Sequence, residues 1–204
     1  LNMTNIEKRC RKSGNTLIHE TDLSDTWNSE SGDRSELLRI EPWGTDGLRV
    51  RATAGNEIVD ADWALTEPVD STAEISITKQ EATIRNGAIS ARISDIRTQN
   101  AHLEFFRHSK SGQEISVLSE KDYVVNAHNP GTRSYRPARN GLFKTEVHFQ
   151  PRKSEKFYGM GLNDTGTVNL KGCVIDLYQR HVKHVVPFVV STEGYGFLWN
   201  NPSI

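Results

Sequence analysis

Residues 37–53 read LLRIEPWGTDGLRVRAT, and this stretch decides the fold class. Apolar and charged side chains alternate one for one in 38–41 (LRIE) and again in 48–51 (LRVR). Alternation with a period of two is typical of a strand that has one face on a core and the other in water. The residues between, 42–47 (PWGTDG), supply proline, glycine and an Asp-Gly pair for a turn. The stretch therefore predicts two paired antiparallel strands.

The same alternation recurs along the chain. Segments 82–85 and 89–93 flank Asn86-Gly87, and Asn-Gly between alternating segments is a strong hairpin signal. Further alternating segments are 103–106, 115–118 and 143–149. Many short strands with turn signals between them, and no convincing amphipathic helix, predict an all-β fold, an antiparallel β-sandwich.

Some stretches are less regular. Residues 126–141 are rich in proline and glycine and are predicted to form a surface loop, whereas the acidic stretch 54–72 fits either a strand or an ordered loop. The nearly continuous apolar run 185–190 predicts a strand buried on both faces. Residues 1–34 are expected to be a lead-in, partly flexible or carrying a first strand. Residues 35–204 are expected to form one sandwich domain.

Composition excludes several classes of protein. The chain has 204 residues and a net charge of −1, and its basic residues are scattered. Nucleic-acid binding proteins cluster lysine and arginine, so nucleic acid is not expected as a partner. No run of about 18 apolar residues occurs, and a membrane partner is not expected either. The composition is that of a soluble globular domain.

The chain has two cysteines, Cys10 and Cys173, and neither belongs to a metal-binding pattern. A disulfide between them is one reading, and two free thiols in a reducing cytoplasm is the simpler one. The first 16 residues, LNMTNIEKRCRKSGNT, are polar and charged and lack the apolar core of a signal peptide. We therefore expect a cytoplasmic protein.

The last third of the chain carries a series of short motifs. In order, they are EKFYGMG at 155–161, NLKG at 169–172, QR at 179–180, PF at 187–188, and STEGYG followed by WNNP between 191 and 202. This series resembles glycoside hydrolase family 31, and residues 37–53 resemble the first strand pair of that family. The resemblance is continuous from about 35 to 202. Each motif alone is weak, and their shared order is what makes chance an unconvincing explanation.

The resemblance implies an N-terminal sandwich of the galactose-mutarotase-like type that packs against a catalytic (β/α)8 barrel expected after residue 204. Family members are retaining, exo-acting enzymes that cleave terminal α-linked sugars. Retention uses two carboxyl groups about 5–5.5 Å apart, and in this family they are two Asp residues of the barrel. No motif for the nucleophile is present here, so we expect no catalytic residue and no cofactor in this chain.

The resemblance also points to a substrate-binding segment. In the family, a loop of the N-terminal domain lines the outer part of the sugar pocket, and the stretch before Pro187-Phe188 matches it. The candidate substrate-binding residues are Asp176, Gln179, Arg180, His181 and Lys171. Arg180 can donate bidentate hydrogen bonds to hydroxyl groups. Alternatively, Arg180 pairs with a carboxylate of the catalytic domain, and Lys171 bridges its loop to a neighbour.

Other residues have a plainer reading. His181 and His184 lack an evident third ligand, so no metal site is expected. Tyr195, Phe197 and Trp199 share one face, which suits packing better than a sugar platform. Many relatives carry an acidic residue or Gln where this chain has Leu162, which puts any role of that carboxylate in doubt.

Two functions remain from the sequence. The first is a non-catalytic domain of an α-xylosidase or α-glucosidase, whose partners are its own catalytic barrel and a carbohydrate, with oligomerisation open. In that case an apolar docking face should be exposed. The second is a stand-alone carbohydrate-binding or structural β-sandwich. Fold analogy alone does not decide between them.

Overall fold

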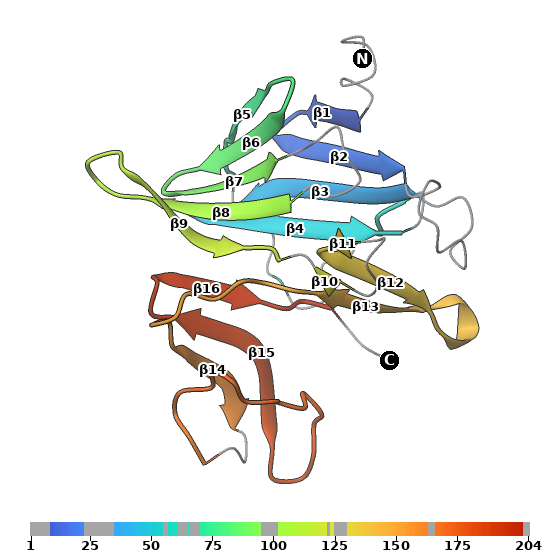
Figure 1. Ribbon diagram of the computed structural model, residues 1–204, viewed down its shortest axis with the longest axis vertical. Helices are drawn as coiled ribbons and strands as arrows, with labels where there is room; N and C mark the ends of the chain where they lie inside the picture. Colours follow the sequence, from blue (N-terminus) through green and yellow to red (C-terminus); the bar gives the residue numbers. More distant parts are fainter. Residues whose placement is uncertain are drawn as a thin grey trace. The chain divides into compact units, whose positions relative to one another are not determined.

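The computed structural model describes residues 9–22, 35–54, 57–60, 65, 70–94, 102–121, 123–124, 130–162 and 166–201. Nearly all regular structure in these ranges is antiparallel β-sheet (Figure 1). The all-β prediction is confirmed. The described chain divides into two compact units: strands β1 to β13 belong to the first and β14 to β16 to the second. None of the helices in the described ranges is long and apolar enough to cross a membrane.

A four-stranded sheet opens the first unit. Its strands, in spatial order, are β1 (Cys10–Ser13), β2 (Thr16–Asp22), β3 (Ser35–Trp43) and β4 (Gly47–Thr53). Strands β3 and β4 are the pair predicted from residues 37–53, with Leu38 opposite Ala52 and Ile40 opposite Val50. Strands β1 and β2 both lie within the predicted lead-in of residues 1–34, for which at most a first strand was expected.

A five-stranded sheet follows. Its strands, also in spatial order, are β5 (Glu74–Ile77), β6 (Glu81–Asn86), β7 (Ile89–Ser94), β8 (His102–His108) and β9 (Glu114–Ser119). The predicted hairpin β6–β7 is present, and the alternating segments 103–106 and 115–118 lie in β8 and β9, which also pair. The first turns at Gly87, whose positive φ of 57° suits glycine, while Asn86 ends the strand. The Asn86 amide donates to the carbonyls of Gly44 and Gly47 and so ties this turn to the β3–β4 turn.

The core lies between these two sheets. One continuous cluster contains Leu17, Leu38 and Ile40 from the first sheet and Ile84 and Ile93 from the second. Each of these side chains is at most 1% exposed. The two sheets therefore bury their alternating apolar faces against each other, which is the arrangement of a β-sandwich.

Two short pairs complete the first unit. Strands β10 (Tyr123–Val124) and β11 (Pro130–Gly131) form one, and β12 (Arg133–Pro137) and β13 (Phe143–Val147) form the other. A 3-10 turn, η2 (Arg139–Gly141), joins β12 to β13. The prediction of a surface loop over 126–141 is therefore wrong for β12. Residues 133–137 pair with β13, and Arg133 turns inward to buried carboxylates. Residues 126–129 lie outside the described ranges.

The second unit is a three-stranded sheet of β14 (Phe157–Leu162), β15 (His184–Ser191) and β16 (Tyr195–Leu198). The register of β14 against β15 shifts between Gly159 and Gly161, and Gly159, Met160 and Gly161 all have positive φ. A Cβ on Gly161 would lie 2.0 Å from the His184 carbonyl oxygen. Glycine is therefore required where β14 passes the start of β15.

Strand β15 is not buried on both faces in this chain. Val186 is 50% exposed, Phe188 39% and Val190 44%, and Leu198 on β16, opposite Phe188, is 42% exposed. Their neighbours Val185, Pro187 and Val189 point the other way and are half-buried. The strand is correctly predicted. Its second face is open because none of the described residues of the second unit packs over it.

Candidate functional site

The segment that carries the candidate substrate-binding residues connects β14 to β15 in the second unit. From Gly166 to Lys183 it forms turns and extended chain rather than a strand. It ends in a tight turn over 180–183, where Arg180 and Lys183 form a β-bridge and the Lys183 N–H donates to the Arg180 carbonyl at 3.1 Å. His181 and Val182 occupy the tip of this turn and are exposed.

The side-chain amide of Gln179 forms hydrogen bonds with the backbone of this turn. Its Nε2 donates to the carbonyl oxygens of Lys183 and Arg180, and its Oε1 accepts a hydrogen bond from the Val185 N–H at 3.2 Å. The structure therefore directs the carboxamide of Gln179 toward backbone, not toward solvent.

Lys171 also contacts backbone. Its Nζ donates to the carbonyl oxygens of Arg152 and Lys153, at 2.5 and 2.9 Å. Asn169, two residues earlier, accepts hydrogen bonds from the N–H groups of Phe157 and Lys171. These contacts anchor the NLKG stretch to the start of β14. They match the bridging alternative for Lys171.

Asp176, Arg180 and His181 all lie exposed on the same segment. The Arg180 guanidinium stacks over the Tyr178 ring, 5.3 Å from its centroid. Stacking on an aromatic face orients a guanidinium while its N–H groups stay available to hydroxyl or carboxylate acceptors. The segment thus presents a cation, an imidazole and a carboxylate at its surface. His181 and His184 are both exposed, and no group of three metal-ligating side chains occurs among the described residues.

A buried carboxylate holds the sheet beside this segment. Glu155 is 1% exposed and accepts hydrogen bonds from Ser191 Oγ, Tyr195 OH and the Arg152 N–H. Burial raises the pKa of the Tyr195 phenol, and its hydrogen bond to Glu155 raises it further. Tyr195 therefore stays a neutral donor. Tyr195, Phe197 and Trp199 are all half-buried, and the Phe197 and Trp199 rings stack with centroids 6.1 Å apart.

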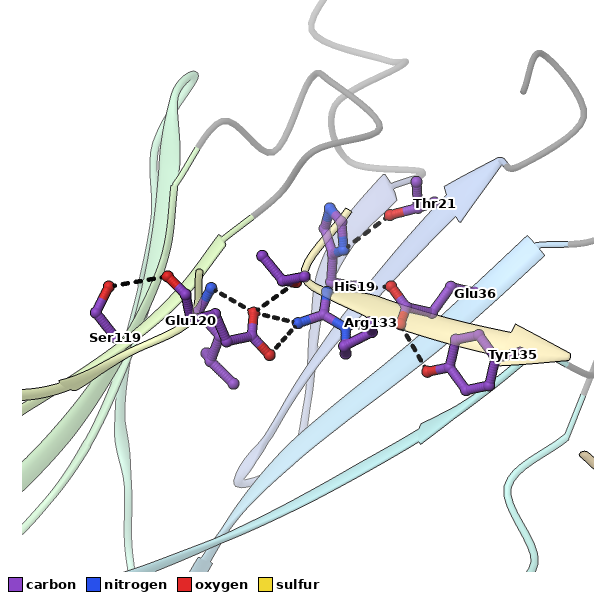
Figure 2. Close-up of polar contacts among 9 residues, drawn as sticks. His19, Thr21, Glu36, Ser119, Glu120, Arg133 and Tyr135 are labelled. Carbon is purple, nitrogen blue, oxygen red and sulfur yellow. Dashed lines mark hydrogen bonds and ion pairs between the residues drawn. The ribbon is translucent and has the colours of Figure 1, made fainter. Parts of the chain in front are cut away.

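The first unit contains a second polar cluster, which is buried (Figure 2). Arg133 on β12 donates through Nε and Nη2 to Glu36 on β3, and through Nη1 to both oxygens of Glu120 just after β9. Tyr135 OH donates to Glu36 at 2.7 Å. The Arg133, Glu36 and Glu120 side chains are 11%, 8% and 3% exposed. One arginine thus links both sheets to the β12–β13 pair.

The electrostatics of this cluster follow from its pairing. Burial alone would raise the pKa of Glu36, but the charge and hydrogen bonds of Arg133 outweigh it and lower that pKa. Glu120 is satisfied further by the Leu103 N–H and by Thr132 Oγ1. Each nitrogen of the Arg133 guanidinium has a carboxylate partner. The cluster therefore has a structural role, holding β12 to the two sheets of the first unit, and we assign it no ligand.

Sequence reasoning missed both buried clusters. Glu36 and Arg133 are 97 positions apart, and Glu155 and Tyr195 are 40 apart. Nothing local marks these residues as partners. The available signal was an Arg and a Tyr at alternating positions, 133 and 135, which placed both side chains on one face of an unrecognised strand.

Comparison with known proteins identifies the class. The model of the glycosyl hydrolase 31 N-terminal galactose mutarotase-like domain matches residues 37–204. The chain belongs to this family. The match spans both compact units, and it agrees with the antiparallel sandwich of the first.

Curated relatives and solved structures agree with the assignment. The chain is 40% identical over 177 residues to an uncharacterized family 31 glucosidase, ORF2, of Pseudescherichia vulneris, covering 83% of this chain and 34% of the relative. It is 32% identical to α-xylosidase A of Aspergillus niger, covering 82% of this chain and 24% of that enzyme. A family 31 α-xylosidase from a soil metagenome, solved with xylose, has a TM-score of 0.75 and 30% identity over 95% of this chain and 28% of its own. The chain thus spans about a third or less of these relatives.

Proposed function

We propose that this chain is the non-catalytic N-terminal domain of a retaining, exo-acting α-glycosidase, an α-xylosidase or α-glucosidase, and that segment 166–183 forms part of the rim of its substrate pocket. The observation that carries the proposal is the exposed group at the end of this segment. Arg180, stacked on Tyr178, and His181 stand at the surface of a turn that internal hydrogen bonds hold in place. Such a preorganised donor set suits sugar hydroxyl groups.

The apolar face of the second unit supports a large partner. Val186, Phe188, Val190 and Leu198 form a continuous exposed face on β15 and β16. Contiguous apolar surface of this kind marks a site of protein contact. The occupant that we propose is the protein's own catalytic domain, since this chain covers only 34% and 28% of two matched relatives. The prediction of an exposed apolar face is met.

The relatives' names bear on the substrate. An α-xylosidase and a family 31 glucosidase are both among them. We therefore propose terminal α-xylosides or α-glucosides as substrates of the whole protein. A cytoplasmic location, expected from the sequence, is part of the same proposal.

The test is a kinetic comparison in the full-length protein. Arg180→Ala should lower kcat/KM for an aryl α-xyloside or α-glucoside by about 10- to 100-fold, because a hydrogen bond to substrate from a charged group is worth about 1.5–3 kcal/mol. His181→Ala should lower it by about two- to tenfold, as for a hydrogen bond worth about 0.5–1.5 kcal/mol. Lys156→Ala is the matched control, an exposed cation of the same unit, and should leave kcat/KM unchanged. If Arg180→Ala and His181→Ala behave like the control, the segment does not line the pocket.

A stand-alone carbohydrate-binding module is the second candidate, since exposed Arg180 beside Tyr178 would also suit a sugar-binding surface. It differs in one measurable respect. If the chain is a stand-alone module, calorimetry with xylose and glucose oligosaccharides should detect binding by the 204-residue chain alone. The domain proposal expects no binding, because the rest of the pocket belongs to the catalytic domain.

A further inference from the structure

The start of β15 is held from two sides. On one side, β14 places Gly161 opposite Val185 and Leu162 opposite His184. Contact is so close that a Cβ on Gly161 would lie 2.0 Å from the His184 oxygen and 2.9 Å from the Val186 nitrogen. The backbone of β14 therefore fixes where β15 begins.

On the other side lies the carboxamide of Gln179. It donates to the Lys183 carbonyl and accepts from the Val185 N–H, so it bonds the two peptide groups that flank His184. A neighbouring strand would bond them in the same way, with one N–H and one C=O. An amide is suited to this position because it carries a donor and an acceptor, whereas a carboxylate only accepts.

The turn over 180–183 depends on these bonds. Its own backbone closes it through the Lys183 N–H and the Arg180 carbonyl, at 3.1 Å. The Gln179 amide contacts the carbonyls of Arg180 and Lys183, at the two ends of the same turn. Arg180 and His181 therefore belong to a turn that is fixed in two ways. Gly161 on β14 packs against the backbone of His184, just after the turn. Gln179 forms hydrogen bonds to the carbonyl groups at both ends of the turn.

From this geometry we infer that Gln179 is the positioning residue of the pocket rim, and that it acts by holding Arg180 and His181 in place, without contacting the sugar. The inference rests on the proposed function of the segment, and it reassigns Gln179 from the set of substrate-binding candidates. The amide is already bonded at both its nitrogen and its oxygen. A sugar contact would have to displace those bonds.

The first test measures the turn and does not depend on activity. In the full-length protein, limited trypsin digestion is followed by mass spectrometry at the two cleavable residues of the turn, Arg180 and Lys183. Gln179→Leu removes all of the amide bonds and should accelerate cleavage there about tenfold, since proteolysis follows the population of locally opened chain. Gln80→Leu, a matched exposed glutamine in the first unit, should not. Unchanged cleavage in Gln179→Leu would overturn the inference.

The second test is a double-mutant cycle of Gln179→Leu with Arg180→Ala, read as kcat/KM. In the wild-type background, Gln179→Leu should lower kcat/KM about tenfold, because a small displacement of a substrate contact slows the reaction. In the Arg180→Ala background, the same substitution should lower kcat/KM by less than about twofold, because the contact that Gln179 positions is already absent. Gln179→Glu, which keeps the acceptor and loses the donor, should fall between wild type and Gln179→Leu.

The outcomes separate the two claims. If Arg180→Ala lowers kcat/KM but Gln179→Leu does not, the proposed function stands and the positioning role is refuted. If Gln179→Leu lowers kcat/KM by the same factor in both backgrounds, Gln179 acts on substrate by itself, which also refutes it. If Arg180→Ala and His181→Ala have no effect, the proposed function fails and the inference fails with it.

Discussion

Arg133 Nε donates a hydrogen bond to Glu36 Oε1 over 2.7 Å, although the two residues are 97 positions apart in the sequence. Arg133 Nη1 bonds Glu120 at the same time, so one guanidinium joins β12, β3 and the end of β9 (Figure 2). Removing one partner of a buried ionic group leaves the others uncompensated in a poorly solvated place. The sandwich should therefore depend heavily on this arginine.

Arg133→Met is expected to lower the free energy of unfolding by about 3–5 kcal/mol. Urea titration followed by tryptophan fluorescence measures it. Arg136→Met, on the same strand with a side chain 54% exposed, is the control and should change stability by no more than about 0.5 kcal/mol. An equal decrease in the free energy of unfolding in the two variants would show that the buried ion pairs of Arg133 do not stabilise the fold.

The same cluster predicts a dependence on acid. The pKa of Glu36 is lower in the folded protein than its ordinary value, because Arg133 and Tyr135 outweigh burial. A carboxyl with a depressed folded pKa contributes stability that is present above its unfolded pKa, about 4.3, and is lost as the pH falls through the folded pKa. Glu36→Gln should therefore flatten the loss of stability between about pH 5 and pH 2. An unchanged acid slope in urea titrations would contradict this.

Gly161 and Gly112 provide a matched pair for backbone strain. Both have positive φ, 80° and 83°, but a Cβ on Gly161 meets the His184 carbonyl, and a Cβ on Gly112 meets nothing within 4 Å. Gly112→Ala should cost about 1 kcal/mol for conformation alone. Gly161→Ala should cost about 1–3 kcal/mol more for the clash. Chemical denaturation checks the difference, and equal costs would mean that β14 does not press on β15 there.

The two thiols should differ in reactivity. Cys10 and Cys173 are both free in the structure, in line with the simpler reading of the sequence. Burial raises the pKa of Cys10 to about 11, and Cys173 is half-buried. Because the thiolate is the reacting form, Ellman's reagent at about pH 8 should modify Cys173 first and Cys10 only after unfolding. Equal rates for the two thiols in the native protein would refute this assignment.

Periodicity predicted the sandwich well because alternation is local. The β3–β4 pair was readable from residues 37–53 because apolar and charged residues alternate in both strands. The burial agrees on β3, where Leu38 and Ile40 are buried, whereas Val50 and Ala52 on β4 are exposed. Strand β12 was missed because Pro130, Gly131, Pro137 and Gly141 in and around it indicate a loop, and its key contact is an ion pair rather than an apolar face. Strand β1, CRKS, buries only Cys10 and has no pattern to detect.

The sequence predicted which segment forms the candidate site. It did not show which residues of the segment hold the backbone in place and which are exposed for binding. Resemblance selected residues 171–181. Only the structure shows that Lys171 and Gln179 bond backbone, while Arg180 and His181 remain at the surface. The direction of a long polar side chain depends on acceptors several residues away, which a motif does not specify. Whether Asp176, Arg180 and His181 meet sugar stays a prediction.

The most direct test of the account compares hydrolysis by the full-length protein and by the 204-residue chain. Aryl α-xyloside and α-glucoside are offered to each, and the anomer first released is followed by proton NMR. The account predicts that the full-length protein releases the α-anomer, as two carboxylates about 5–5.5 Å apart require, and that the chain alone releases nothing. Turnover by the chain alone, or no turnover of either substrate by the full-length protein, would contradict it.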